Sequence, residues 1–216
     1  MSNDKKIGIL GSGVVAQALG RGFARHGYDV MLGTRDAAKL ESWRSETEGK
    51  VAVGSFADAA RHGDIVVLAL NGAGAADALA LAGPSSFDGK LVLDATNPLD
   101  FSQGMPPGLF VGTSDSLGEQ IQRQLPGAYV VKCLNTVGNP QMIDPGFAEG
   151  VPAMLIAGND ANAKGRTEAL LRECGWPEAI DVGGIDGARW LEALVPLWVR
   201  VGIQQGSWGH AFKVVR

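Results

Sequence analysis

The sequence is poor in the residues that build disulfides and metal sites. Among 216 residues there are 2 cysteines, Cys133 and Cys174, and 3 histidines. The cysteines lie far apart and lack the Cys-x-x-Cys spacing of a zinc site. This excludes a disulfide framework and a cysteine-built zinc site, and two free thiols are typical of a reducing compartment. We expect no metal site and a cytoplasmic location.

A long apolar run and an excess of positive charge are also missing. The sequence has 19 Lys and Arg against 23 Asp and Glu, a net charge of −4, which argues against a nucleic-acid-binding surface. The most apolar segment near the C-terminus is interrupted by Glu192, Pro196 and Arg200, so it cannot span a bilayer. The first residues lead directly into a strand-like run, without the pattern of a signal peptide. We therefore expect neither nucleic acid nor membrane among the partners.

The sequence is rich in glycine, 31 of 216 residues, and it alternates short apolar runs with helical patterns. Several runs are apolar throughout, as in parallel strands that are buried on both faces. The alternation predicts an α/β fold, namely a Rossmann doubly wound parallel sheet with a C-terminal helical extension. The expected strands are 5–10, 28–33, 51–53, 64–70, 90–95, 129–134 and 153–158, and the expected helices lie near 14–26, 36–48, 56–62, 73–82, 115–124, 160–174 and 187–205.

A glycine-rich loop joins the first strand to the first helix and fits the G-x-G-x-x-A fingerprint of dinucleotide-binding proteins. The first glycine allows the tight turn, the second lets a pyrophosphate approach the backbone, and the alanine allows close packing of helix and strand. The helix N-terminus adds free N–H groups and a partial positive charge. The alternative is a glycine-rich turn without a ligand. The residues expected to hold the pyrophosphate are Gly11, Ser12, Gly13, Val14 and Val15, and Ala16 completes the fingerprint.

The end of the second strand indicates which nicotinamide cofactor binds. An NAD site carries a carboxylate there for the ribose hydroxyls, but this sequence has Thr34 and Arg35. Lys39, four residues after Arg35, is expected on the same helical face. These three side chains suit a 2′-phosphate, and we predict a tenfold to thousandfold preference for NADPH over NADH, about 1.4–4 kcal/mol. Asp36 is expected to face the positive end of the second helix rather than a ribose hydroxyl.

Three further segments end at the carboxyl edge of the predicted sheet, where ligands of doubly wound folds lie. The backbone after the fourth strand suits the adenosine or a ribose. Asparagine carboxamides after the fifth and sixth strands suit the nicotinamide amide or its ribose, with a capped turn as the alternative. The residues concerned are Leu70, Asn71 and Gly72, then Asn97 and Pro98, and finally Asn135.

No side chain qualifies as a catalytic acid or base. The Tyr-x-x-x-Lys pattern of short-chain dehydrogenases is absent, because Tyr129 and Lys132 are one residue too close together. Lys132 lies in an apolar strand and is expected to form a structural ion pair with Asp94. Hydride transfer to a flat, conjugated acceptor needs little acid–base help from the protein. The missing acid is therefore in keeping with such a reaction.

Two of the three histidines are explained by helix ends, and the third has no assigned role. His26 and His62 each close a helix before a glycine, Gly27 or Gly63, that is expected to adopt the left-handed cap conformation. His210 lies in the C-terminal tail, and nothing nearby in the sequence is expected to orient it.

Two segments are candidates for an acceptor pocket and for contact with a partner. Residues 102–114 hold three glycines and two prolines, and a loop of this length in a compact domain is more often functional than idle. Residues 188–201 are apolar nearly all round, so we expect a helix that packs on the sheet and against a partner subunit, with a kink at Pro196. Trp190 and Trp198 are expected in the core or an interface, with a wall of the acceptor pocket as the alternative.

Five segments, in order along the chain, carry a family resemblance: Gly11-Ser12-Gly13, Gly33-Thr34-Arg35 with Lys39, Asn97-Pro98, Val131-Lys132-Cys133-Leu134-Asn135-Thr136-Val137 and Ala188-Arg189-Trp190-Leu191-Glu192-Ala193-Leu194. They resemble the NADPH-dependent deazaflavin reductases, the NADP oxidoreductases that depend on coenzyme F420, and the cytosolic domain of the STEAP metalloreductases is similar. The resemblance covers nearly the whole chain. Deazaflavin reductases can carry a histidine at the position of Asn135, whereas STEAP-like members carry asparagine.

The resemblance implies a Rossmann domain that binds NADP(H), a hydride passed to a deazaflavin or flavin stacked against the nicotinamide, and a homodimer. We thus expect an NADP(H)-dependent oxidoreductase whose small-molecule co-substrate is coenzyme F420 or a flavin, and which dimerises through the C-terminal helix. The alternatives are a reductase of a small carbonyl or imine and a non-enzymatic NADP(H)-binding redox sensor. Residues 1–152 are expected to form the NADP-binding Rossmann domain, and 153–216 a strand–helix extension packed on the same sheet.

Overall fold

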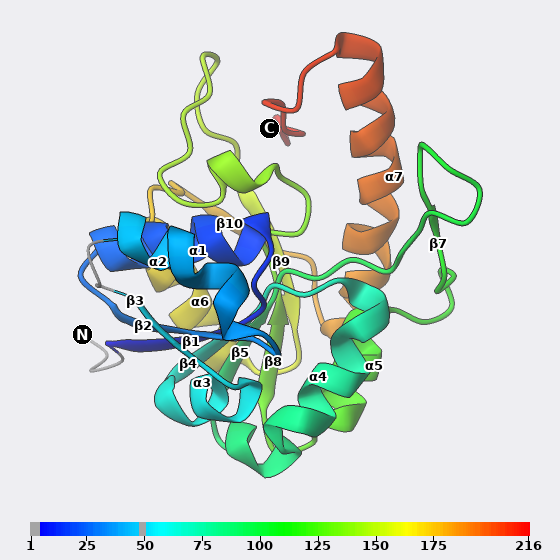
Figure 1. Ribbon diagram of the computed structural model, residues 1–216. Helices are drawn as coiled ribbons and strands as arrows, with labels where there is room; N and C mark the ends of the chain where they lie inside the picture. Colours follow the sequence, from blue (N-terminus) through cyan, green and yellow to red (C-terminus); the bar gives the residue numbers. More distant parts are fainter. Residues whose placement is uncertain (1–4, 48–50) are drawn as a thin grey trace.

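An eight-stranded sheet with helices on both faces forms the body of the molecule (Figure 1). The structure is a computed structural model that describes residues 5–47 and 51–216. The strands are β1 (Lys6–Leu10), β2 (Asp29–Gly33), β3 (Val51–Gly54), β4 (Ile65–Leu68), β5 (Leu91–Asp94), β8 (Tyr129–Lys132), β9 (Met154–Gly158) and β10 (Ala179–Asp181). The helices are α1 (Val14–Arg25), α2 (Glu41–Glu46), α3 (Phe56–His62), α4 (Ala75–Ala82), α5 (Leu117–Gln124), α6 (Ala161–Glu173) and α7 (Ala188–Gln205).

The strand order is β10-β9-β8-β5-β4-β1-β2-β3. From β3 to β8 all neighbours are parallel, and β1 pairs with β2 on one side and β4 on the other. The direction of winding therefore reverses between β1 and β4, which is the switch point of a Rossmann sheet. The predicted fold class and the predicted strands are confirmed. The helix predicted over 36–48 is a 3-10 turn, η1 (Ala37–Leu40), followed by α2, and its last residue lies outside the described residues.

The end of the sheet departs from the prediction. β9 runs antiparallel to β8, and the unpredicted β10 pairs with β9 in parallel. The connection from β8 to β9 contains one 3-10 turn, η4 (Asn139–Gln141), and no α-helix, so the chain turns back at the same end of the sheet instead of crossing its face. β10 has only three residues, none of them fully buried, which left no apolar run to detect. Both strands extend the common sheet, while a domain boundary at residue 152 stays a prediction.

The fully apolar strands are explained by helices on both faces of the sheet. In β4, Ile65 and Val67 face one core cluster, which includes side chains of α1 and α6. Val66 and Leu68 face the other, which includes side chains of α3, α4 and α5. All four side chains are at most 3% exposed. Alternate residues thus enter opposite cores, and no position in the strand is left for a polar side chain.

The last helix lies beside the sheet and runs past it, as Figure 1 shows in orange and red. One side of α7 is buried through Leu191, Val195 and Val199. The side that carries Trp190 and Leu197 is exposed, at 62% and 51%. The helix is therefore apolar on two sides but covered by its own chain on only one. Pro196 lies within α7, and the predicted kink there stays a prediction.

The C-terminal tail folds back onto α7 and orients His210, contrary to the expectation from the sequence. The rings of His210 and Trp198 are stacked with centroids 4.8 Å apart. Trp198 Nε1 donates to the His210 carbonyl at 3.0 Å, and His210 Nε2 lies 3.0 Å from the Trp198 carbonyl. Trp208 sits over Gly202, where a Cβ would come within 2.7 Å of its ring. The Trp198 side chain therefore stacks on, and hydrogen-bonds to, the C-terminal tail of its own chain.

The two histidine–glycine junctions differ from each other. Gly27 has φ +83°, the predicted left-handed conformation, and His26 Nε2 lies 2.7 Å from Asp144 Oδ1. Gly63 has φ −74°, so the prediction of a left-handed cap there was wrong. Glycine is needed at that position for space, because a Cβ would lie 2.4 Å from the backbone nitrogen of Gly8.

A buried charge cluster joins α7 to the sheet. Lys132 and Asp94 are register partners at the ends of β8 and β5, and Lys132 Nζ lies 2.9 Å from Asp94 Oδ2, which confirms the predicted pair. Lys132 Nζ also lies 2.7 Å from Glu192 Oε1 of α7 and donates to the Thr96 carbonyl at 2.6 Å. The Lys132 side chain is completely buried. Each of its three N–H groups therefore has an oxygen partner.

Glu192 has a second role, at the start of α5. Its two carboxylate oxygens accept the backbone N–H groups of Leu117 and Gly118 at 2.9 and 3.0 Å. A carboxylate is favoured there by the positive end of the helix. Burial by itself lowers the pKa of Lys132, but the carboxylates of Asp94 and Glu192 raise it, and the net pKa lies above its ordinary value of 10.5. The ammonium form is thus favoured by folding at every pH below 10.5, and this contribution is lost only at more alkaline pH.

We expect Lys132→Met to lower the free energy of unfolding by about 3–5 kcal/mol at pH 7, because it leaves two carboxylates buried without their counter-ion. Guanidinium chloride unfolding measures the loss. Lys164→Met is the matched control: Lys164 Nζ lies 2.7 Å from Asp181 Oδ2, whose side chain is half exposed, and the expected loss is about 0–1 kcal/mol. Equal losses in the two variants would contradict a structural role for the buried cluster.

Candidate functional site

The N-terminus of α1 is open to a ligand. Gly11 has φ +142°, and a Cβ there would lie 2.2 Å from the Ala69 carbonyl oxygen, so only glycine fits the turn. Gly13, the N-cap residue, has no side-chain cap, and the first turn of α1 has no acidic residue. A Cβ on Gly13 would meet nothing within 4 Å. The free N–H groups and the space above Gly13 suit a pyrophosphate.

At the end of β2 the chain makes a turn stabilised by side chains. The Thr34 hydroxyl accepts the Asp36 N–H at 3.1 Å, and Asp36 accepts the Ala38 N–H at 3.2 Å. Asp36 thus caps the 3-10 turn, as predicted. Arg35 precedes this turn, so the helical face predicted for Arg35 and Lys39 together was wrong. Lys39 is 72% exposed, and its Nζ lies 3.9 Å from Asp36 Oδ2.

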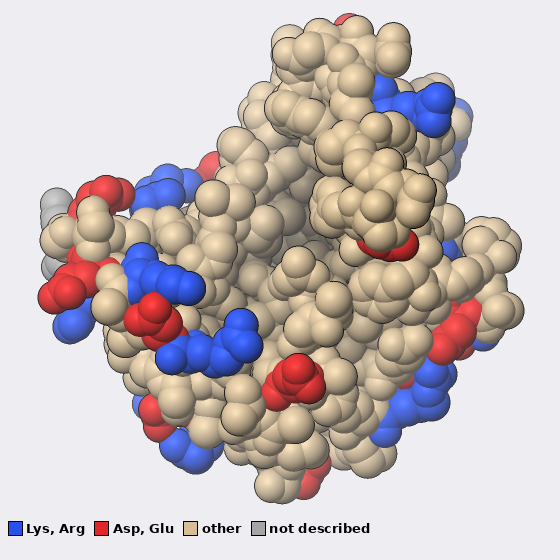
Figure 2. Space-filling view, turned by 45° about the vertical axis from the view of Figure 1, so that its right-hand side comes forward, with Lys and Arg blue, Asp and Glu red and all other residues tan. Residues whose placement is uncertain are grey.

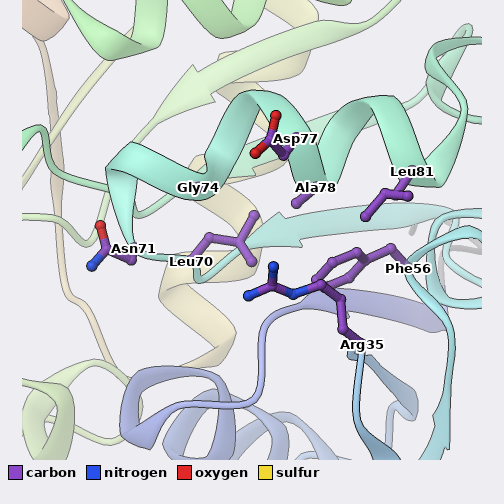
Figure 3. A pocket seen from close by; sticks show the side chains of 8 residues that line it. All are labelled: Arg35, Phe56, Leu70, Asn71, Gly74, Asp77, Ala78 and Leu81. Atoms are coloured by element: carbon purple, nitrogen blue, oxygen red, sulfur yellow. The ribbon is translucent and has the colours of Figure 1, made fainter.

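A narrow slot lies between Arg35 and helix α4 (Figure 3). Its volume is about 100 Å³. The Arg35 side chain runs beside the Phe56 ring, and its guanidinium points towards Leu70 and Asn71. A guanidinium over an apolar slot can stack on a purine base. The slot is lined by Arg35, Phe56, Leu70, Asn71, Gly74, Asp77, Ala78 and Leu81.

A larger cleft of about 470 Å³ lies at the carboxyl ends of β1, β4 and β5. None of the residues that line it is titratable. Figure 2 shows a face of the molecule that is hollowed near its centre, and the atoms around this hollow are mostly tan, from uncharged residues. The loops after β4 and β5 touch beside the cleft, since a Cβ on Gly72 would lie 2.2 Å from the Asn97 carbonyl oxygen. The lining residues are Gly13, Val14, Val15, Ala69, Leu70, Asn71, Gly72, Ala95, Asn97, Leu99 and Phe101.

The cleft and the slot bring together most of the predicted site residues, namely Gly13, Val14, Val15, Arg35, Leu70, Asn71, Gly72 and Asn97. Thr34 and Lys39 lie at the end of β2, and Thr34 is only 8% exposed. The Pro98 carbonyl accepts the Phe110 N–H at 3.0 Å. Asn135, which is 5% exposed, donates to the Asn97 side chain and is not among the residues that line the cleft. Contact of each of these residues with a cofactor stays a prediction.

Sequence reasoning missed the hairpin that borders the cleft. The strands β6 (Leu99–Asp100) and β7 (Gly108–Leu109) pair antiparallel, and they include part of the predicted loop 102–114. Leu99 and Phe101 line the cleft, and Phe101 is 52% exposed. Met105 and Phe110 on the same hairpin are 57% and 44% exposed. The length of the loop 102–114 and its glycines and prolines pointed to this segment, but they did not reveal that part of it pairs into a hairpin.

Neither cysteine is suited to act as a nucleophile. Burial raises the pKa of the Cys133 thiol far above its ordinary value and that of Cys174 to about 12. Both thiols are therefore uncharged at neutral pH and inaccessible. Within residues 5–47 and 51–216, no helix is long and apolar enough to cross a membrane.

An open helix N-terminus at a Rossmann switch point, next to an uncharged cleft, is typical of dinucleotide-dependent oxidoreductases. Comparison with known proteins agrees. The family described as NADP oxidoreductase coenzyme F420-dependent matches residues 6–98. A proposed F420-dependent NADP reductase from Arthrobacter sp. FB24 has a crystal structure that covers 99% of this chain and 100% of its own, with 41% identity and a TM-score of 0.94.

Two curated relatives are more distant. The F420-dependent NADP reductase of Methanothermobacter marburgensis is 27% identical over 92% of this chain and 93% of its own length. The metalloreductase STEAP3 of Rattus norvegicus is 26% identical over 89% of this chain and 38% of its own length. The chain belongs to the family of F420-dependent NADP oxidoreductases and is an NADP-dependent oxidoreductase.

A pair of glycine substitutions separates binding from folding. Gly13→Ala adds a Cβ in open space above the helix N-terminus, so we expect the free energy of unfolding to change by less than about 1 kcal/mol. The same Cβ obstructs the pyrophosphate, and we expect at least about tenfold weaker NADPH binding, or 1.4 kcal/mol. Gly11→Ala meets the Ala69 carbonyl and is expected to destabilise the fold. Fluorescence titration and thermal unfolding measure both effects, and unchanged NADPH affinity in Gly13→Ala would contradict the assignment.

Arg35 is the charge expected to select NADPH. We expect Arg35→Ala to reduce the ratio of the NADH and NADPH dissociation constants by about tenfold or more, because a charge-assisted hydrogen bond contributes about 1.5–3 kcal/mol. The affinity for NADH is expected to fall less than that for NADPH, because NADH loses only the stacking of the guanidinium on the adenine. Arg172→Ala is the control with the same loss of charge, on α6, where Arg172 pairs with Glu168 on the surface. Equal affinity of the unaltered protein for NADPH and NADH would contradict the prediction.

Proposed function

We propose that the protein transfers a hydride between NADPH and a deazaflavin or flavin whose ring stacks on the nicotinamide in the large cleft. The observation that carries the proposal is the lining of this cleft, which has apolar side chains and no titratable group. In such a site the protein holds two rings face to face and excludes water. NADPH supplies the hydride when it is bound.

The cofactor is proposed to lie along the carboxyl ends of the strands. Its pyrophosphate would sit on the open N-terminus of α1, over Gly13, and its adenosine in the slot beside Arg35 and Leu70. Thr34, Arg35 and Lys39 would surround the 2′-phosphate. The nicotinamide would then cross the switch point to the large cleft and lie near Asn97 and Pro98, because the two halves of a dinucleotide bind on opposite sides of that point.

The wall opposite the proposed nicotinamide is apolar. Val14 is 68% exposed and Phe101 52%, and both line the cleft. These side chains can pack on a flat ring without hydrogen-bonding to it. Reduction of a carbonyl would produce an alkoxide that needs a proton donor, and none of the lining residues can supply one. The lining thus favours a conjugated ring, which delocalises the added electrons, over a simple carbonyl.

The names of the relatives support the same acceptor. The protein from Methanothermobacter marburgensis is called an F420-dependent NADP reductase, and it aligns over 93% of its length. Coenzyme F420 is therefore the first acceptor to be tested, with flavins next. In this proposal residues 1–152 bind the cofactor, and residues 153–216 complete the sheet and supply α7.

We also propose a homodimer that forms through α7. Trp190 and Leu197 are exposed and two turns apart on one side of the helix, with the half-buried Leu194 and Val201 between and beyond them. A stripe of this spacing can pair with the same stripe on a second copy around a two-fold axis. Light scattering measures the mass of the particle in solution. We expect the mass of a dimer for the unaltered protein and that of a monomer for Leu197→Glu.

The acceptor is tested by anaerobic mixing of the protein with NADPH and oxidised coenzyme F420, following the deazaflavin absorbance. We expect catalytic bleaching, and Phe101→Ala is expected to raise KM for the acceptor several-fold while leaving the NADPH dissociation constant unchanged. Flavin mononucleotide, a cyclic imine and a small ketone are tested in parallel.

The possible outcomes separate the candidate functions. Bleaching of F420 or reduction of the flavin supports the proposal. Turnover of only the imine or the ketone would overturn it in favour of a reductase of small organic substrates. Tight NADPH binding without oxidation by any acceptor would overturn it in favour of a redox sensor.

A further inference from the structure

Two asparagines from different strands hold each other by reciprocal hydrogen bonds. Asn97 Nδ2 donates to the Asn135 carbonyl oxygen at 3.0 Å, and Asn135 Nδ2 donates to Asn97 Oδ1 at 2.9 Å. Asn135 Nδ2 donates a second bond, of 3.0 Å, to the carbonyl oxygen of Leu191 in α7. The pair therefore connects the segment after β5, the segment after β8 and the last helix.

The orientation of the Asn135 amide is fixed by this arrangement. Both of its N–H groups face oxygen acceptors, so a flipped amide would place its own oxygen against two other oxygens. As oriented, Asn135 Oδ1 is buried and has no hydrogen-bond partner among the described residues. An unpaired buried acceptor lowers stability. This cost offsets part of the stability that the two hydrogen bonds donated by Asn135 contribute.

The two asparagines differ in their access to the cleft. Asn97 lines it, whereas Asn135 does not and is 5% exposed. A carboxamide has two donor hydrogens and two acceptor lone pairs. Asn97 uses one hydrogen and one lone pair on Asn135, which leaves one of each for a ligand in the cleft. The rotation of the Asn97 side chain, and hence the direction of these groups, is set by Asn135.

We propose that Asn135 is a positioning residue: it fixes the Asn97 amide so that this amide hydrogen-bonds the carboxamide of the nicotinamide. This rests on the proposed placement of the nicotinamide in the large cleft. Through Leu191, Asn135 also links the amide to α7. Leu191 is next to Glu192, which is held by Lys132 and by the start of α5. The helix and the carboxamide-binding amide are thus kept in one relative position.

The test compares the binding of NADP⁺ with that of its 3-acetylpyridine analogue, in which the carboxamide is replaced by an acetyl group without N–H donors. We expect the unaltered protein to bind NADP⁺ at least tenfold more tightly than the analogue. In Asn135→Leu, which removes both donors, the two dissociation constants are expected to come within threefold of each other. Asn97→Ala is expected to give the same result, although only Asn97 lines the cleft.

Two controls distinguish positioning from a general loss of structure. The first is the affinity for 2′,5′-ADP, which occupies the other half of the dinucleotide site and is expected to stay unchanged in Asn135→Leu. The second is Thr167→Val, which removes a buried hydroxyl that donates to the Ala163 carbonyl in α6 at 2.8 Å and is expected to retain the preference for NADP⁺. If Asn135→Leu does not fold, Asn135→Asp, which also lacks the N–H donors, takes its place.

The inference is overturned if the Asn135 variants still bind NADP⁺ more tightly than the analogue. It is also overturned if these variants lose affinity for 2′,5′-ADP as much as for NADP⁺, or if the unaltered protein binds NADP⁺ and the analogue equally well. The measurement uses no hydride acceptor. The deazaflavin proposal can therefore fail while the role of Asn135 stands. Equally, F420 can be reduced while the Asn135 variants keep the preference for NADP⁺, which overturns only the role of Asn135.

Discussion

The structure depends on one buried ammonium group. Lys132 Nζ is shared between Asp94 at the end of β5 and Glu192 in α7, and Glu192 also binds the first N–H groups of α5. The two groups of a buried charge pair cannot move apart easily, because a buried charge without its partner strongly destabilises the folded protein. The carboxyl edge of the sheet and the C-terminal helix are thereby fixed to each other. The segment after β5, which lines the large cleft through Ala95 and Asn97, is held by the same cluster, because Lys132 also donates to the Thr96 carbonyl.

A second connection limits rotation of α7 about that point. The Arg189 guanidinium makes two hydrogen bonds, of 2.8 and 2.6 Å, with the Glu119 carboxylate on α5. These bonds hold the pKa of Glu119 below its ordinary value. Arg189 and Glu192 together attach the first turns of α7 to α5. The C-terminal half of α7 is supported instead by the tail, through the stacked rings of Trp198 and His210.

Much of the fold could be predicted from the sequence because its strands are apolar throughout and its helices are well delimited. Gly11 and Gly13 identified the open turn before α1, and Lys132 in an apolar strand identified its partner Asp94. Contacts between distant segments were not predictable. Glu192 lies 60 positions after Lys132 in the sequence, and nothing local marks it as a partner. The antiparallel direction of β9 was missed for a similar reason, since an apolar run does not reveal which way a strand enters the sheet.

The ends of the sheet restrict how molecules of this protein can associate. The edge strands are short: β3 has 4 residues and β10 has 3. At the β10 edge, Asp181 accepts the Gly183 N–H and pairs with Lys164, which places charge beside the open backbone groups. Short, charged edges are poor templates for strand addition, the usual route to uncontrolled aggregation of β-sheets. The edge strands therefore disfavour hydrogen bonding between the sheets of two molecules. Molecules of this protein can instead associate through surfaces formed by side chains.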